Sequence, residues 1–499
     1  MAKGSVSVFF TFILVSVMCL IFTMSECIRL YEMQSFAQEY TDIAVESTFS
    51  EYNAYLWTNY KILAVDLGYG SSLKGPETME EKTLDYCKYN ADVSDGFNYA
   101  RLFAESCTVN KYAFLTDKNG EGVIGLGVQA AKDGMAGQVV DGIQNHIDTV
   151  NGIEKIPVEE KVKSGKSSLD NAKAELAEKR RAAAEDDNPD TNPDDYPEPE
   201  EVEDNPLEAF DILKESFSKG VLATVTNAEK LSDVSVSLEK MPSHRQLSKG
   251  NLDFEEGVSL VDKALFLDYL ITNYSYFGHD LEHDGLNYEV EYLLSGKETD
   301  PQCLASVVEQ LLLVREGANF ITIQTTRELN TQALSMAEAL AGFTGNPVII
   351  EAVYNAVIGA WAYAEATLDV RLLLNGGKIA PIKNLTQWTT DLWHLSNVCN
   401  INFKARDCGE GTGYKEYLIG FLALRTNEKL ATRALDIMEN ALNSTDDYKD
   451  VKVDNMVWAA DIEMTYSAKE MFLSLFERES ESKGEIGQYY FARNKFISY

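Results

Sequence analysis

The N-terminal stretch places the strongest constraint on this chain. Gly4 to Ser25 contains no charged residue, and Ser5 to Leu67 contains neither glycine nor proline. A helix of 22 residues spans roughly 33 Å, close to the ~30 Å thickness of the hydrocarbon core of a bilayer. No helix breaker follows, so the sequence predicts a transmembrane helix that continues as a helical stalk.

A cleaved secretory signal is the main alternative for this segment. Its apolar region is usually about 7–15 residues long and ends at a site of small residues. The run here is longer, and Ser25-Glu26-Cys27 is a poor cleavage site. We therefore expect a retained anchor in the cell membrane. Lys3 and the short N-terminal flank favour a cytoplasmic N-terminus, with the bulk of the chain extracytoplasmic.

Composition excludes some classes of function. The net charge of −35 and the isoelectric point near 4.5 argue against nucleic-acid binding, because a phosphate backbone needs a basic surface. The seven cysteines contain no CxxC pair, so neither a zinc ribbon nor a redox motif is expected. Outside the cell, Cys87 with Cys107 and Cys399 with Cys408 could form disulfides; reduced, buried thiols are the alternative.

Periodicity predicts a helix-rich α+β fold. The first helix should end near Thr58, and alternating residues around Ile462 indicate a strand with one buried face. A further strand is expected at Tyr288. We expect strands at 61–65, 112–116, 123–130, 457–466 and 488–491, and helices at 304–314, 347–375, 414–424 and 428–442.

Composition along the chain suggests four consecutive regions. Residues 1–25 hold the transmembrane segment, and 26–160 a helical stalk with a small α+β region. Residues 161–206 form a charged helix followed by an acidic, proline-rich linker, which has too little apolar surface to fold. Residues 207–499 form a larger helix-rich α+β domain.

One motif suggests metal chemistry. His279, Glu282 and His283 fit H-x-x-E-H, in which two histidines on one helix face bind zinc and the glutamate acts as a base. Gly278 and Gly285 bracket the motif, which indicates a loop rather than a helix. A solvated loop and adventitious metal binding are therefore the alternatives to a zinc site.

A charged pair marks the point where the apolar segment ends. Glu26 and Arg29 are spaced i and i+3, so they can pair on one helix face at the membrane boundary. We expect Glu26 to register the helix against neighbouring membrane helices, because a partly buried carboxylate requires a partner. Ordinary interfacial charges are the alternative.

The N-terminal segment and three later stretches resemble a known family. The start Gly4-Ser5-Val6-Ser7-Val8-Phe9, the apolar span and Glu26-Cys27-Ile28-Arg29 resemble the N-terminus of TadE/TadG-like proteins of the Tad (Flp) pilus system. Stretches 288–294, 314–320 and 360–371 are similar to an uncharacterised family of TadE/G-associated membrane proteins, mainly from Gram-positive anaerobes. The resemblance implies a pseudopilin-like role without a known catalytic function.

The resemblance also implies a leader-processing site between Gly4 and Ser5. Pilin-type leaders commonly have glutamate five residues after the glycine, whereas this chain has Phe9. That departure favours an assembly accessory over a filament subunit.

The sequence thus predicts a non-enzymatic, single-pass surface protein of Tad-type pilus assembly. Its expected partners are the membrane and pilins or assembly-platform proteins. No cofactor, nucleic acid or small-molecule substrate is expected. Two alternatives stay open: a membrane-anchored zinc metallopeptidase that uses His279, Glu282 and His283, and a surface-tethered binding module unrelated to pili.

Overall fold

The computed structural model describes residues 2–70, 75–91, 100–134, 156–186, 192–196, 198–199, 201–227, 229, 231–254, 259–472 and 487–499, without the side chains of 2–5 and 260. The fold is helix-rich α+β with an N-terminal apolar helix, as the sequence predicts. Contacts divide the chain into two units. Unit 1 comprises Met1–Leu126, Met241–Gly257 and Leu442–Tyr499; unit 2 comprises Gly127–Lys240 and Val258–Ala441. This grouping is not consecutive, because the C-terminal strands fold with the N-terminal helix.

Unit 1 begins with α1 (Ala2–Phe49), one continuous helix of 48 residues. The helix ends before the predicted Thr58, because Asn53 starts a new helix, α2 (Ala54–Tyr60). The Asn53 side chain accepts a hydrogen bond from the Leu56 backbone N–H at 2.9 Å, a standard N-cap. The strand predicted at 61–65 is only the short β1 (Val65–Asp66).

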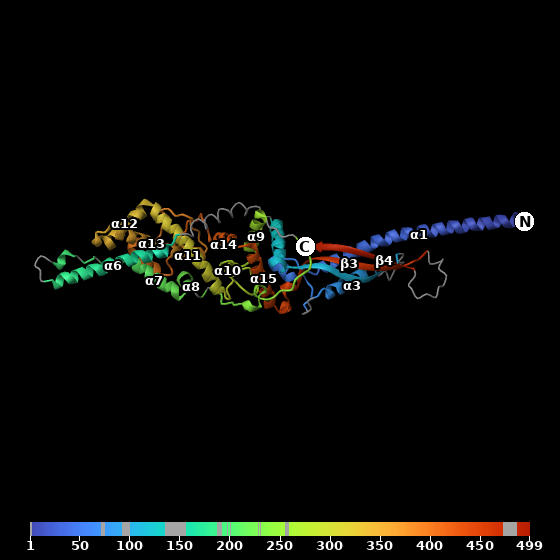
Figure 1. Cartoon of the computed structure of the whole chain (residues 1–499), viewed down its shortest axis with the longest axis horizontal. Coiled ribbons are helices and arrows are strands. Elements are labelled where there is room, and N and C mark those ends of the chain that lie inside the picture. Colours follow the sequence, from blue (N-terminus) through green and yellow to red (C-terminus); the bar gives the residue numbers. More distant parts are fainter. Residues whose placement is uncertain are drawn as a thin grey trace. The chain divides into compact units, whose positions relative to one another are not determined.

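A four-stranded antiparallel sheet forms the rest of unit 1. Its central strand is β3 (Met456–Lys469), which pairs with β1, β2 (Leu102–Phe114) and β4 (Gln488–Ser498). The strands predicted at 457–466 and 488–491 are confirmed. Helices α1 and α3 (Glu77–Ala91) cover one face of this sheet (Figure 1). The core between them includes Met33, Ala37, Val45, Val109, Ile462, Met464 and Tyr466.

Two predicted strands are helices in the structure. Residues 123–130 lie in α4 (Glu121–Asp133), not in a strand. The glycines that suggested strand boundaries allow close packing instead: a Cβ on Gly122 would lie 2.7 Å from the Trp458 indole nitrogen. The strand expected at Tyr288 is also wrong, since Tyr288 is the N-cap residue of α10 (Glu289–Ser295).

Unit 2 is built around α13 (Pro347–Leu374), against which α6 (Val158–Glu185), α7 (Pro206–Lys219), α11 (Asp300–Thr325) and α12 (Arg327–Ala341) pack (Figure 1). The other helices of this region are α8 (Val221–Val225), α9 (Leu260–Asn273), α14 (Tyr414–Ala423) and α15 (Asn427–Ser444). The helices predicted at 304–314, 347–375, 414–424 and 428–442 are confirmed.

Local signals define both ends of α13. Asn346 accepts a hydrogen bond from the Val348 N–H at 3.0 Å, and Pro347 occupies the first turn. At the other end, Gly376 has φ +83°, a conformation that stops the helix at little cost for glycine. The sequence prediction for this helix is therefore accurate at both ends.

Part of the predicted acidic linker, residues 187–191, 197 and 200, lies outside the described residues, and Pro193–Asp195 form a short 3-10 turn.

All seven cysteines are free thiols, so neither suggested disulfide is present. Cys87 and Cys107 are both buried in the core of unit 1, where burial raises the pKa of the Cys107 thiol to about 12.

Candidate functional site

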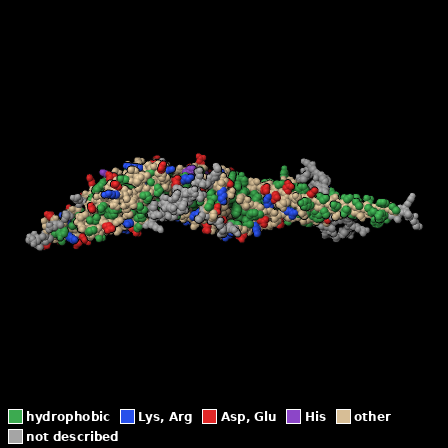
Figure 2. Space-filling view, turned by 90° about the horizontal axis from the view of Figure 1, so that it is seen from above, with side chains coloured by type: hydrophobic (Ala, Val, Ile, Leu, Met, Phe, Trp, Pro, Cys, Tyr) green, Lys and Arg blue, Asp and Glu red, His purple; other side chains and the backbone are tan. Residues whose placement is uncertain are grey.

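The first half of α1 exposes its apolar side chains. Phe9, Phe12 and Leu14 are 61%, 70% and 62% exposed, and the most apolar window of the helix has no buried residue. In Figure 2 the visible face of this end of the helix carries mainly hydrophobic side chains. Such a surface is compatible with a transmembrane helix, because apolar side chains are more stable in contact with lipid than with water.

Two threonine hydroxyl groups of this segment bond within the helix. The Thr11 hydroxyl donates to the Ser7 carbonyl at 2.8 Å, and the Thr23 hydroxyl donates to the Cys19 carbonyl at 2.9 Å. These bonds leave no hydroxyl donor of Thr11 or Thr23 without an acceptor in an apolar surrounding.

Burial changes abruptly at Glu26 and Arg29, which are 1% and 0% exposed. Arg29 Nη1 donates to Glu26 Oε1 at 2.6 Å. Arg29 Nη2 donates to the carbonyls of Ala100 and Lys469, at 2.7 and 2.8 Å. The backbone N–H of Phe472 donates to Glu26 Oε2 at 2.9 Å. The pair therefore links α1 to the chain just before β2 and to the end of β3.

The sequence locates this pair but not its partners. Spacing alone predicts that Glu26 and Arg29 can meet, and it suggests a neighbouring helix as the further partner. In the structure the further partners are backbone groups of unit 1, from positions far away in the sequence. Backbone carbonyls have no sequence signature, so sequence reasoning could not identify them.

The other predicted site residues are not brought together with this pair. Gly4 and Ser5 lie in the first turns of α1, and their side chains are outside the described part. The H-x-x-E-H motif lies in the loop between α9 and α10. There Glu282 is exposed with φ +57°, the His279 ring packs 4.9 Å from Tyr276, and His283 Nδ1 lies 3.0 Å from Glu289 Oε2.

This loop does not present the three side chains on one helix face, as the zincin pattern requires. Across the described residues, no group of three or more His, Cys, Asp or Glu side chains is placed to hold a metal ion.

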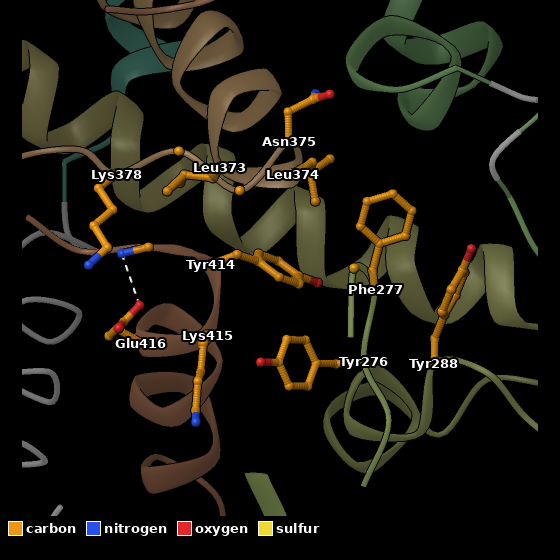
Figure 3. A pocket seen from close by; sticks show the side chains of 14 residues that line it. Tyr276, Phe277, Tyr288, Leu373, Leu374, Asn375, Lys378, Tyr414, Lys415 and Glu416 are labelled. Atoms are coloured by element: carbon orange, nitrogen blue, oxygen red, sulfur yellow. Dashed lines mark hydrogen bonds between the residues drawn. The ribbon is translucent and has the colours of Figure 1, made fainter. Parts of the chain in front are cut away.

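Sequence reasoning missed a pocket of 620 Å³ in unit 2 (Figure 3). Three distant segments form it: residues 276–278 with Tyr288, residues 373–378 at the end of α13, and residues 413–416 at the start of α14. Aromatic residues were visible in the first and third of these segments. Their convergence was not, because it depends on how the helices pack.

Aromatic rings make the inner wall of the pocket and polar groups its rim. Phe277, Tyr288 and Tyr414 are buried, whereas Lys378 and Lys415 are exposed (Figure 3). The rings pack pairwise, Phe277 with Tyr288 at 5.5 Å between centroids and Tyr276 with Tyr414 at 6.4 Å.

A buried carboxylate braces this wall from behind. Glu291 is fully buried, and its Oε1 accepts from the Tyr414 hydroxyl at 2.7 Å and from the Phe277 N–H at 3.0 Å. Burial raises the pKa of Glu291 to about 7. The two wall residues are thereby fixed to one side chain of α10.

A second buried cluster lies between α11 and α13. Arg315 Nε donates to Asp369 Oδ2 at 3.0 Å, and Lys383 donates to both Asp369 and Glu365. Two cations thus meet two anions. Although burial alone would raise it, the pKa of Asp369 is held below its ordinary value by Lys383 and Arg315. These charges satisfy one another, which is typical of a structural network.

The fold and the exposed helix define a helix-rich α+β protein with an apolar N-terminal arm. Residues 196–468, more than half of the chain, match the model of DUF5702, a family of unknown function. The chain belongs to this family. The matched region includes most of unit 2 and strand β3, but not α1. Comparisons with curated proteins and with solved structures give no match.

Proposed function

We propose that this protein is a non-enzymatic, single-pass surface protein that acts as a pseudopilin-like or accessory component of Tad-type pilus assembly. The supporting observation is the division of α1 into two parts within one unbroken helix. Its first part is apolar and exposed, and its second part is packed on an antiparallel sheet. Glu26 and Arg29 stand where one environment changes to the other.

A continuous helix with this division suits a subunit that works in a membrane assembly. The exposed part offers a surface for lipid or for other membrane helices. The packed part transmits any displacement of that surface to the sheet, because no flexible turn separates them and the buried pair ties the helix to β3. We propose that the N-terminus is cytoplasmic and that both units are extracytoplasmic.

Site-specific photo-cross-linking in the producing cells tests the assignment. With p-benzoylphenylalanine in place of Leu20, which is 61% exposed on α1, we expect cross-links to pilins or to Tad assembly-platform proteins. The matched control carries the same residue in place of Val348, 73% exposed on α13 of unit 2. Cross-links from position 20 to lipid alone, or the same partners from both positions, would contradict the proposal.

Orientation is tested independently by protease accessibility. Protease added to intact, wall-stripped cells should cut the acidic segment 185–206, because this segment would lie outside the membrane. Full protection of that segment would overturn the orientation but not the pilus assignment.

The metallopeptidase alternative gains no support from the geometry. His279, Glu282 and His283 lie in a loop, and the His283 ring is engaged by Glu289.

A further inference from the structure

The pocket of unit 2 has no role in the proposed anchoring or assembly. Its volume of 620 Å³ lies within the range of small-molecule sites, about 300–1,000 Å³. Its wall is also preformed. Glu291 holds Tyr414 and Phe277, and the Tyr288 hydroxyl accepts a hydrogen bond from the Ser232 N–H at 2.9 Å. A preformed wall lowers the entropic cost of binding.

We propose that this pocket binds a saccharide, as a short segment of a glycan chain. The part-exposed ring of Tyr276, with the buried Tyr414 ring behind it at 6.4 Å between centroids, offers a surface for the apolar C–H face of a sugar ring (Figure 3). Around them stand both hydrogen-bond donors and acceptors: Asn375, Lys378 and Lys415 at the rim. Sugar hydroxyls donate and accept together, so they match such a mixed rim.

Both lysines of the pocket have a carboxylate in their surroundings, which favours sugar hydroxyls over an anion. Lys378 faces Asp407, a carboxylate that accepts from the backbone N–H groups of Lys378 and Gly409 at 3.2 and 2.9 Å. Burial raises the pKa of Asp268, and the positive charge of Lys415 partly offsets this rise. Glu416 accepts from the Gly413 N–H at 3.0 Å (Figure 3).

Other ligand classes fit this lining less well. The carboxylate of Glu416 occupies the N-terminus of α14, where a phosphate of a nucleotide would otherwise bind, and it would repel that phosphate. A purely apolar ligand would leave the exposed Lys378 and Lys415 at its edge. No strand edge is among the residues that line the pocket, so an extended peptide has no ladder to join.

Ligand-observed saturation-transfer NMR on the detergent-solubilised full chain tests the proposal. The probes are chitotriose and maltotriose, which are neutral, and trigalacturonate, which is acidic. We expect transfer to at least one neutral trisaccharide at millimolar concentration. Tyr276→Ala should weaken its binding about tenfold, the effect of one lost ring contact. Tyr276→Phe should restore it, because the ring remains.

The control is Trp393→Ala, which removes a surface ring of unit 2 (43% exposed) that does not line the pocket. If Tyr276→Ala fails to fold by circular dichroism, Lys378→Gln replaces it at the exposed rim, with Lys404→Gln as its control. We expect Lys378→Gln to weaken binding about threefold, since one hydrogen bond to a charged group is lost.

Three results would overturn the proposal: no transfer to any probe, transfer to trigalacturonate alone, or binding that Trp393→Ala weakens as much as Tyr276→Ala. The inference concerns unit 2 only. Its failure would leave the proposed role of α1 untouched, and a failed cross-linking experiment at position 20 would leave the pocket untouched.

Discussion

Helices α1 and α13 are alike in composition and opposite in environment. Both are long and apolar enough to cross a membrane. The apolar window of α1 has no buried residue, whereas 56% of the window in α13 is buried within unit 2. Charges explain the difference. The apolar part of α1 has none from Gly4 to Ser25, while α13 carries Glu365, Asp369 and Arg371, which bond inside the protein.

The comparison shows that hydropathy and length do not separate an exposed apolar helix from the central helix of a helical domain. What separates them is whether charged groups with intramolecular partners interrupt the apolar face. Each of the following experiments changes one side of this comparison, in order of decreasing expected effect.

Deleting residues 2–24 should move the protein from the membrane fraction to the soluble fraction almost completely, because it removes the apolar part and keeps Glu26 and Arg29. Cell fractionation with carbonate extraction measures this. The control Val348→Lys adds a charge at an exposed site of α13 and should leave the distribution unchanged. A deletion variant that stays in the membrane would show that another segment anchors the chain.

Asp369→Ala should destabilise unit 2 by about 3–5 kcal/mol, because Arg315 and Lys383 would lose their shared partner while buried. Hydrogen exchange of the α13 amides in denaturant measures the change. Glu351→Ala on the exposed side of the same helix should change it by less than about 0.5 kcal/mol. Equal effects of the two substitutions would mean that the buried network adds nothing to the stability of unit 2 beyond an ordinary surface position.

Arg29→Met should destabilise unit 1 by about 3 kcal/mol, since the buried Glu26 carboxylate loses its cationic partner. The double variant Glu26→Gln/Arg29→Met should be less destabilised than Arg29→Met alone, because no buried charge remains. Hydrogen exchange of the β3 amides checks the order, with Glu39→Gln on the exposed face of α1 as control. The reverse order would refute a buried pair.

The stability of unit 2 should fall as the pH rises through the neutral range. Burial raises the pKa of Glu291 and of Glu316 from 4.5 to about 7. A raised carboxyl pKa means that the folded state keeps protons which the unfolded state has lost. Stability is therefore fullest below about pH 4.5 and declines up to about pH 7, by roughly 3 kcal/mol for each group.

Thermal unfolding of the wild type across this range measures the decline. Glu291→Gln and Glu316→Gln should each flatten it. A stability that rises from pH 4.5 to 7 would contradict the assignment of these two carboxyl groups.

Asn346→Ala should cost about 1 kcal/mol, the usual value of an N-cap, because the Val348 N–H loses its acceptor. Asn53→Ala at the start of α2 is the matching change in unit 1. Thermal unfolding compares the two. No loss in either variant would mean that packing alone sets these helix starts.

Sequence reasoning succeeded where the signal was local. Asn346, Pro347 and Gly376 mark the ends of α13, and alternation marks β3. It failed where long-range packing overrode local preference. Residues 123–130 lie in α4 despite Gly125 and Gly127, and the preceding Gly122 lies close to the Trp458 indole. The pocket could not be foreseen, since Tyr276, Leu374 and Tyr414 meet only through the packing of α9, α13 and α14.

The pairing of β2 with β3 has a consequence for biosynthesis. Leu102 pairs with Ala468, so the sheet under α1 cannot close until almost the whole chain has been made. The ribosome releases α1 first and β4 last, with all of unit 2 in between. Until translation ends, Arg29 has no Lys469 carbonyl to bind, and the half-made sheet exposes apolar surface. A chain truncated before β3 would keep its apolar arm and never complete its sheet, so the apolar surface that the sheet normally covers would stay exposed.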